Sequence, residues 1–336
     1  MPWGSLASHL KGIAMAPSFA SADPLNFHRQ LARFNVTRVA VATPTSQWQQ
    51  ALHSELAYRL VEGEYLESLR EQVAPMIPEH DWDSENFVSW FESLALIGPG
   101  QHHPLFDWLA NYATLPQMRW FLTQEAAGEA GFEDLIAYTQ VKLPAQAKLE
   151  CARNYWDEMG HGKELAMHGQ MLERMVRELD LQPAIDTTVW EALALSNTML
   201  GLAMTRRYTY HALGALGVIE LTAPQRVSKV STGMRRLGMN NRMRAYFDLH
   251  ATQDVSHSRA WIQEIIHPLV KADPACAQFI AEGALMRLVC GERCFERYSQ
   301  ELKANQHAYP NLGIDLRRFR SRRWSCIAKR ANSARV

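Results

Sequence analysis

The stretch "YFDLHATQDVSHSRAWIQEIIHPL", residues 246–269, decides the fold class, because it is strongly helical and carries three polar side chains on one face. His250, Asp254 and His257 are separated by offsets of four and seven residues. At about 100° per residue these offsets return to within roughly 40° of the starting direction. Two imidazoles and a carboxylate that share a helix face are typical of metal coordination, so we interpret the three residues as metal ligands.

The helical pattern continues in both directions, and no segment shows a convincing alternation of strand type. Proline and glycine supply the stops between helices, for example at Pro144 and Pro268. The sequence therefore predicts an all-α bundle without internal repeats. The expected helices are 46–75, 84–97, 104–112, 117–140, 145–160, 164–180, 187–219, 223–237, 240–267 and 273–304.

Three regions are expected along the chain. Residues 1–45 mix Pro, Ser, Ala and Gly without a sustained period and predict an irregular N-terminal arm. Residues 46–305 form the helical domain. Residues 306–336 form a basic tail that we interpret as a solvated, flexible terminus, with an RNA- or partner-binding arm as the alternative.

Composition bounds the class of protein. The chain has 336 residues, of which 47% are hydrophobic, and a formal net charge of zero, so nothing overall favours binding to nucleic acid or to a membrane surface. Five cysteines without dense spacing argue against a disulfide scaffold and for a reducing compartment. The longest apolar run, residues 193–204, is too short to span a bilayer. We expect a cytoplasmic protein.

Two further segments are rich in oxygen and nitrogen donors. They are "RWFLTQEAAGEAGFEDL", residues 119–135, and "ARNYWDEMGHGKELAMHGQML", residues 152–172. A lone acidic pair on a helix is usually surface charge, but carboxylates and imidazoles without thiolates are the donors that iron and manganese favour for redox chemistry. The first segment offers Glu125 and Glu129, and the second offers Asp157, Glu158, His161 and His168.

These motifs together resemble the heme-oxygenase-like di-iron oxidase/oxygenase family, also called iron-containing redox enzymes. The resemblance covers about residues 100–300 and rests on Glu129, "NYWDEMGHG" leading to His168, and "HATQDVSH". It implies a heme-oxygenase-like helical bundle with a di-metal site in its core. The ligands that it implies are Glu129, Glu158, His168, His250, Asp254 and His257.

Two of these assignments leave alternatives. Glu125 competes with Glu129 as the ligand from the first segment, and we prefer Glu129 for its position relative to "GFEDL". Glu158 and His168 are ten residues apart, which places them about 80° apart on a regular helix. Because Gly160 and Gly162 weaken the helix between them, we expect a break or bulge that turns His168 toward the metal.

A ferritin-like site is the structural rival. Glu158 with His161, and Glu264 with His267, each form a Glu-x-x-His pair of the kind that builds that other di-iron centre. This arrangement would leave the triad of the third helix without a role, and His267 directly precedes Pro268, where the helix should end. A metal-free helical binding module is a further alternative.

By resemblance, the expected activity is O2-dependent oxidation by a non-haem di-iron centre in specialised metabolism, as N-oxygenation or oxidative C–C or C–H cleavage. The cofactors would be two Fe2+/Fe3+ ions, with O2 as co-substrate and an external electron source as an option. The expected partner is a small-molecule substrate; a reductase and a homodimer are compatible with this interpretation, and no nucleic acid or membrane partner is expected.

The substrate pocket is the least defined part. Arg206 or Arg207 can reach inward and bind a carboxylate as a two-pronged donor, which suggests a small amino-acid-derived or carboxylate metabolite. The same apolar stretch, residues 197–220, also suits ordinary core packing. Further substrate-binding or supporting residues are expected at Tyr155, Trp156, Tyr210 and Glu220.

Overall fold

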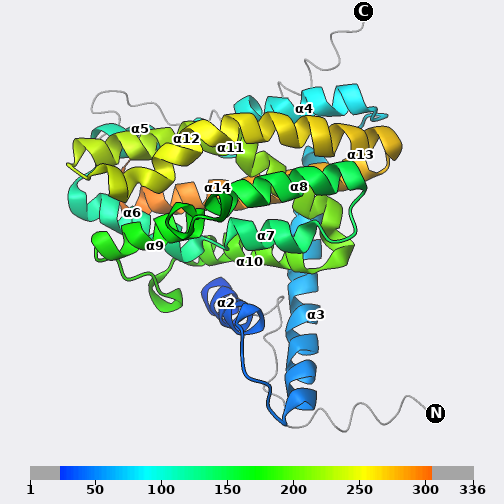
Figure 1. Ribbon diagram of the computed structural model, residues 1–336, viewed down its shortest axis with the longest axis horizontal. Helices are drawn as coiled ribbons and strands as arrows, with labels where there is room; N and C mark the ends of the chain where they lie inside the picture. Colours follow the sequence, from blue (N-terminus) through cyan, green and yellow to red (C-terminus); the bar gives the residue numbers. More distant parts are fainter. Residues whose placement is uncertain (1–22, 305–336) are drawn as a thin grey trace, which may run out of the picture.

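A computed structural model describes residues 23–304, and every regular element in that range is helical (Figure 1). The all-α prediction is confirmed for these residues. The main helices are α2 Pro24–Val39, α3 Trp48–Val73, α4 Ser84–Ile97, α5 Pro104–Asn111, α6 Leu115–Gly128, α7 Phe132–Thr139, α8 Ala145–Glu158, α9 His168–Glu178, α10 Trp190–Met204, α11 Thr209–Arg236, α12 Asn241–Trp261, α13 His267–Ala272 and α14 Cys276–Glu301.

Helix α11 lies at the centre of the molecule and packs against both α12 and α14. Glycines make the contact with α14 close. A Cβ atom on Gly214 would lie 1.9 Å from the Ile280 carbonyl oxygen, and one on Gly283 would lie 1.9 Å from the His211 carbonyl oxygen. Since any side chain there would push the helices apart, the small residues of the stretch after residue 196 serve this packing.

Two clusters of buried apolar side chains form the core, one on each half of the α11–α14 pair. One cluster includes Leu135, Met199 and Leu216, and the other includes Ala192 and Tyr298. Close packing of such side chains keeps the helix backbones rigid with respect to one another. The helices that surround the junction of the clusters are therefore held in place before any ligand binds.

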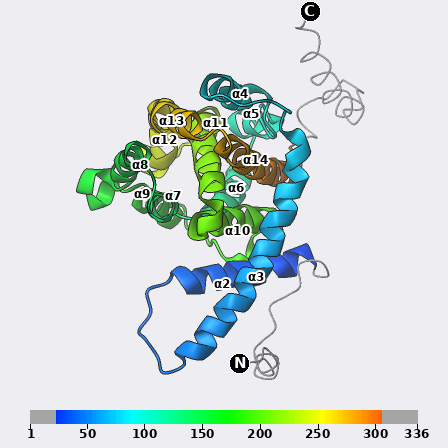
Figure 2. The same cartoon turned by 90° about the vertical axis from the view of Figure 1, so that its right-hand side faces the viewer.

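The N-terminal region departs from the prediction of an irregular arm. Residues 24–39 form helix α2, which begins after the N-cap Asp23 and buries Phe27 and Leu31 in the core. Sequence patterning missed it because the buried face of the helix also contains the polar residues His28 and Asn35. Figure 2 shows α2 crossing α3, whose first half projects from the body.

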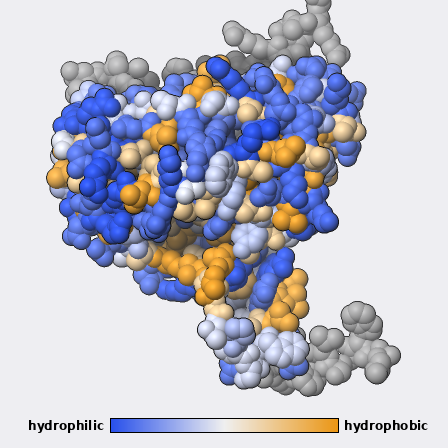
Figure 3. Space-filling view, viewed as in Figure 1, coloured by the Kyte–Doolittle hydropathy of each residue, from blue (hydrophilic) through white to orange (hydrophobic). Residues whose placement is uncertain are grey.

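The projecting half of α3 exposes an apolar stripe at intervals of four residues, visible as hydrophobic colour on the arm in Figure 3. The exposed side chains are Trp48, Leu52, Leu56 and Leu60.

Several expected helix boundaries are wrong. The segment 117–140 is divided into α6 and α7 around Gly131, which has φ +74°. The segment 187–219 is interrupted at Thr205, and α11 then continues through Pro224. A single proline removes one hydrogen bond, and packing on two neighbouring helices outweighs that loss. Helix α12 likewise runs through a π-helical turn, Ile262–Ile266, into α13, which has Pro268 in its first turn.

No helix among the described residues is long and apolar enough to cross a membrane. The basic tail expected at 306–336 and the first part of the expected arm, 1–22, lie outside the described residues.

Candidate metal centre

Two groups of three donor side chains lie in the core. Within each group the donor atoms are all within 4.8 Å of one another. Donors that bind a first-row metal at about 2.0–2.2 Å are separated by up to roughly 4 Å, so each group has nearly the dimensions of a metal site. The first group is Glu158, His168 and His250, and the second group is Glu220, Asp254 and His257.

The first group joins α8, α9 and α12. His168 Nδ1 lies 2.6 Å from Glu158 Oε2 and 3.1 Å from His250 Nε2. The Nδ1–H of His250 donates to the Tyr246 carbonyl oxygen at 2.7 Å, which leaves the Nε2 lone pair of His250 directed at the other two donors. A backbone carbonyl that fixes the imidazole tautomer in this way is a common support for a metal-bound histidine.

A break after α8 brings His168 to Glu158. Helix α8 ends at Glu158, and a 3-10 turn, Gly160–Gly162, separates it from α9, which begins at His168. Gly160 has φ +57°, and a Cβ atom there would lie 2.3 Å from the Ala166 carbonyl carbon. The predicted helix break is thus confirmed, and glycine is required at its first turn.

The second group joins α11 and α12, with support from α8. His257 Nδ1 lies 3.5 Å from Glu220 Oε2 and makes no hydrogen bond. On the other side of the ring, the Nε2–H of His257 donates to Asp157 Oδ2 at 3.0 Å. Asn154 Nδ2 donates to Glu220 Oε1 at 2.7 Å. Asp157 and Asn154 therefore orient the side chains of His257 and Glu220, but they do not belong to the group of three that could hold a metal ion.

The electrostatics of the two groups favour a bound cation. Burial, followed by the charge of Glu220, raises the pKa of Glu158 well above its usual range and that of Asp254 to about 9. Burial lowers the pKa values of His168 and His250 to about 4, so both imidazoles are neutral at pH 7 and have free lone pairs. Neutral imidazoles beside carboxylates that need positive charge form a donor set that fits a cation.

His257 carries the opposite shift. Burial alone would lower its pKa, but contact with Glu220 and then with Asp157 raises the pKa of His257 to about 9. The proton on His257 thus supplies, in the second group, part of the positive charge that a metal ion would otherwise supply.

The identities of the donors fit iron. Both groups contain only carboxylate oxygens and imidazole nitrogens. The cysteines of the described region, Cys151, Cys276, Cys290 and Cys294, are buried elsewhere as free thiols. A mixed oxygen and nitrogen set suits iron or manganese better than structural zinc, which thiolates usually close off.

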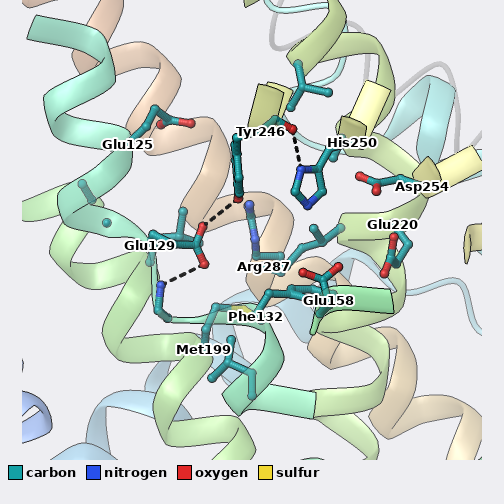
Figure 4. A pocket seen from close by; sticks show the side chains of 18 of the residues that line it. Glu125, Glu129, Phe132, Glu158, Met199, Glu220, Tyr246, His250, Asp254 and Arg287 are labelled. Carbon is teal, nitrogen blue, oxygen red and sulfur yellow. Dashed lines mark hydrogen bonds between the residues drawn. The ribbon is translucent and has the colours of Figure 1, made fainter. Parts of the chain in front are cut away.

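A cavity of about 130 Å³ adjoins both groups (Figure 4). Glu158, Glu220, His250 and Asp254 form one side of it. The remaining polar lining comes from Glu125, Glu129, Tyr246, Arg287 and Tyr298. The apolar walls include Phe132, Leu135, Leu195, Met199 and Ile219. A concave site with apolar walls and a few polar groups is typical of small-molecule binding.

Glu125 and Glu129 line the cavity but belong to neither donor group. Glu129 follows the last residue of α6, where Oε1 accepts from the backbone N–H groups of Ala130 and Gly131, and Oε2 accepts from the Tyr246 hydroxyl at 3.4 Å. Burial raises the pKa of both glutamates. The expected ligand from the first segment is therefore absent from the two groups, and Glu220, expected only as a support, stands among the donors instead.

Except for Glu220, the residues expected to bind or support the substrate lie outside the lining of the cavity. Arg206 donates to the Thr139 carbonyl oxygen at 3.2 Å, and Arg207 pairs with Glu67 at the surface. Because a 3-10 turn, Arg206–Tyr208, interrupts the expected helix here, neither guanidinium reaches the cavity. Tyr155, Trp156 and Tyr210 are likewise not among the lining residues; Trp156 is 52% exposed.

The ferritin-like arrangement is not assembled. His161 pairs with Asp157, and its side chain is 63% exposed. Glu264 accepts from Gln146, and His267 contacts Glu85 at 2.8 Å. These partners place the second Glu-x-x-His pair at the α8–α13–α4 surface, away from the donor groups.

Sequence reasoning did not assign a supporting role to Asn154 or to Asp157, which it named only among the possible donors, and it missed the cavity residue Arg287. A local pattern does point to the first two, because Asn154, Asp157 and Glu158 occupy one face of the same helix at offsets of three and four. Glu220 had a weaker indication, as the lone acid in an apolar stretch. Arg287 had none.

The fold and the site together define a helical protein with two adjacent groups of side chains that could hold metal ions. The chain belongs to the iron-containing redox enzyme family, whose model matches residues 119–292. None of the curated proteins compared with the chain matches it.

Two solved structures are similar in fold. A CADD-like protein of unknown function from Nostoc punctiforme has 16% identity and a TM-score of 0.53, over 65% of this chain and 98% of that one. A domain of unknown function with a heme oxygenase-like fold, from Shewanella denitrificans, has 14% identity and a TM-score of 0.48, over 68% of this chain and 97% of that one. Family membership and the first likeness confirm the expected fold class.

Proposed function

We propose that the protein is an O2-dependent non-haem di-iron oxidase or oxygenase that acts on a small carboxylate or amino-acid-derived metabolite. The observation that carries this proposal is the pair of three-donor groups beside one cavity. Each group supplies both carboxylate and imidazole, the donors used by redox-active iron. The proposed ligands of one iron ion are Glu158, His168 and His250, and those of the other are Glu220, Asp254 and His257.

The protein side chains prepare this site in three ways. The Tyr246 carbonyl holds the imidazole of His250 in the tautomer that directs a lone pair inward, and the Asp157 carboxylate would hold His257 in the same way once a metal ion replaces the proton on its Nδ1. Asn154 restrains the Glu220 carboxylate. The apolar walls limit water near the reacting atoms. When bound, a pair of iron ions supplies the electrons for reductive activation of O2.

The test is anaerobic loading of apo-protein with Fe(II), followed by rapid mixing with O2 while visible absorbance is recorded. We expect the wild type to bind two irons per chain, one for each donor group, and to give a transient visible band. His257→Ala should lose the band, because the substitution removes the His257 Nδ1 atom, which has no hydrogen-bond partner and is a proposed metal ligand of the second group.

His267→Ala is the matched control. It removes an imidazole from the helix that follows α12, but that imidazole contacts Glu85 and belongs to neither group. The control should retain both irons and the band. Loss of iron in His267→Ala with retention in His257→Ala would favour the ferritin-like site instead. Absence of iron binding in the wild type would refute the enzyme proposal and favour a metal-free binding module.

A further inference from the structure

Arg287 of α14 contributes an unusual charge to the cavity. It is the one arginine or lysine among the described residues that line this space. Its Nε atom is buried and has no hydrogen-bond partner, and no residue within 23–304 forms a hydrogen bond or ion pair with its guanidinium. A buried N–H group without a partner is costly, so the Nε–H of this half-buried arginine is available to a ligand.

The two cavity glutamates on which the charge of Arg287 acts, Glu125 and Glu129, already have hydrogen-bond partners. Glu129 accepts hydrogen bonds at both oxygens, from the backbone of Ala130 and Gly131 and from Tyr246. Glu125 is hydrogen bonded to Tyr298. Both glutamates interact with Arg287 through charge, but neither approaches within ion-pair distance. In Figure 4 the Arg287 side chain lies between Glu129 and His250, with the donor groups beyond.

Arg226 is the other arginine near this region, and it is differently placed. It donates to the Thr222 carbonyl oxygen at 2.9 Å and lies over the Phe295 ring, 5.3 Å from its centroid. It does not line the cavity. A ligand inside the cavity therefore meets Arg287 and not Arg226.

We propose that Arg287 binds the carboxylate of the substrate and directs the rest of the molecule toward the two donor groups. This assignment rests on the proposed function, which it makes more specific. A guanidinium holds a carboxylate through two parallel N–H···O bonds, which fix orientation as well as position. The ligand class is a short carboxylic acid with an apolar body, because the apolar walls of the cavity include Phe132, Leu135 and Met199.

The charge balance of the loaded site supports an anionic ligand. Three ligand carboxylates carry −3 and two divalent ions carry +4, so the centre would have a net charge of +1. Arg226 and Arg287 offset Glu125 and Glu129. One substrate carboxylate would neutralise the remainder, and a buried site favours such neutrality.

The test compares two probes of nearly equal shape, 4-methylpentanoate and its neutral amide, 4-methylpentanamide. Calorimetry on the iron-loaded protein under anaerobic conditions gives the ratio of their affinities. We expect the wild type to prefer the acid by about 10- to 100-fold, the range for a hydrogen-bonded ion pair inside a protein. Arg287→Gln should abolish that preference, and Arg287→Lys should restore part of it, because lysine keeps the charge but lacks the planar fork.

Arg293→Gln is the matched control, since Arg293 lies on the same helix but bonds Gln72. It should keep the preference for the acid. Iron content and the O2-dependent band, measured on the same samples, report on the proposed function separately. Equal binding of acid and amide by the wild type, or an unchanged preference in folded Arg287→Gln with normal iron content, would overturn the assignment of Arg287.

Discussion

The two donor groups contrast in how they are built. The first group depends on a broken helix, since Glu158 ends α8 and His168 begins α9 after two short 3-10 turns. The second group lies on two continuous helices, α11 and α12. The first is supported by a backbone carbonyl, whereas the second is supported by side chains.

Helix α8 nevertheless serves both groups. Its last turn and the turn before it supply Glu158 to the first group, and Asn154 and Asp157 as supports for the second. The contrast teaches that the second group, although it lies on two continuous helices, still depends on a third helix, α8, for the orientation of its side chains. It also separates the expected consequences of three substitutions, at His168, Gly160 and Asp157.

The largest effect is expected from removal of one donor of the first group. His168→Ala should weaken binding of one of the two metal ions by more than about 100-fold, beyond the range for loss of a mere supporting residue. The other ion should stay bound, because His168 is absent from the second group. Anaerobic titration with Co(II), followed by its visible absorption, measures the two occupancies. Loss of both ions together would show that the groups are not independent sites.

Gly160→Ala should be the next largest change. The alanine Cβ would meet the Ala166 backbone at 2.3 Å, and φ +57° is unfavourable for a residue with a side chain. We expect a loss of about 2 kcal/mol or more in unfolding free energy, and weaker metal binding at the first group than at the second. Thermal or urea unfolding and the Co(II) titration measure these effects. Gly63→Ala is the control, because no atom lies within 4 Å of its added Cβ.

Asp157→Asn should act on the second group alone. It removes the carboxylate that accepts from His257 Nε2–H, and loss of such a support lowers metal affinity by roughly 10- to 100-fold. Binding at the first group should change little. His161→Ala serves as the control, since it removes the other imidazole that contacts Asp157 and leaves the carboxylate in place. Equal weakening of both sites by Asp157→Asn would contradict the division into groups.

The smallest effect concerns a buried imidazole outside both groups. Burial, then the charge of Arg293, lowers the pKa of His28 to about 3. The unfolded chain takes up this proton near pH 6.5 and the folded chain does not, so the contribution of neutral His28 is lost as pH falls from 6.5 toward 3. Between pH 8 and pH 5 the wild type should lose about 2 kcal/mol more stability than His28→Gln. Urea unfolding at both pH values tests this, and equal losses would contradict the burial of a neutral imidazole.

A comparison of His28 with His257 separates the effect of burial on a histidine pKa from the effect of neighbouring carboxylates. The imidazole of His28 stacks on Trp190 and has no carboxylate partner among residues 23–304, whereas His257 is held between Glu220 and Asp157. The opposite directions of their two pKa shifts follow from that difference.

The features of the candidate site on which the sequence prediction and the structure agree are local. A regular helix repeats every 3.6 residues, so the shared face of His250, Asp254 and His257 follows from spacing alone. The break between Glu158 and His168 was predictable for the same reason, because two glycines stand where a regular helix would keep the residues apart. The division of the triad between two groups was not predictable, because it depends on which neighbouring helix faces each residue.

The sequence by itself determined the helical class, the family and the donors carried by single helices, since those depend on periodicity and short motifs. Tertiary structure alone decided that Glu220 joins the donors, that Arg206 and Arg207 face away, and that Arg287 enters the cavity. These outcomes depend on how α11 and α14 pack across Gly214 and Gly283. Such packing depends on close contact between residues about 70 positions apart in the chain, which no local pattern encodes.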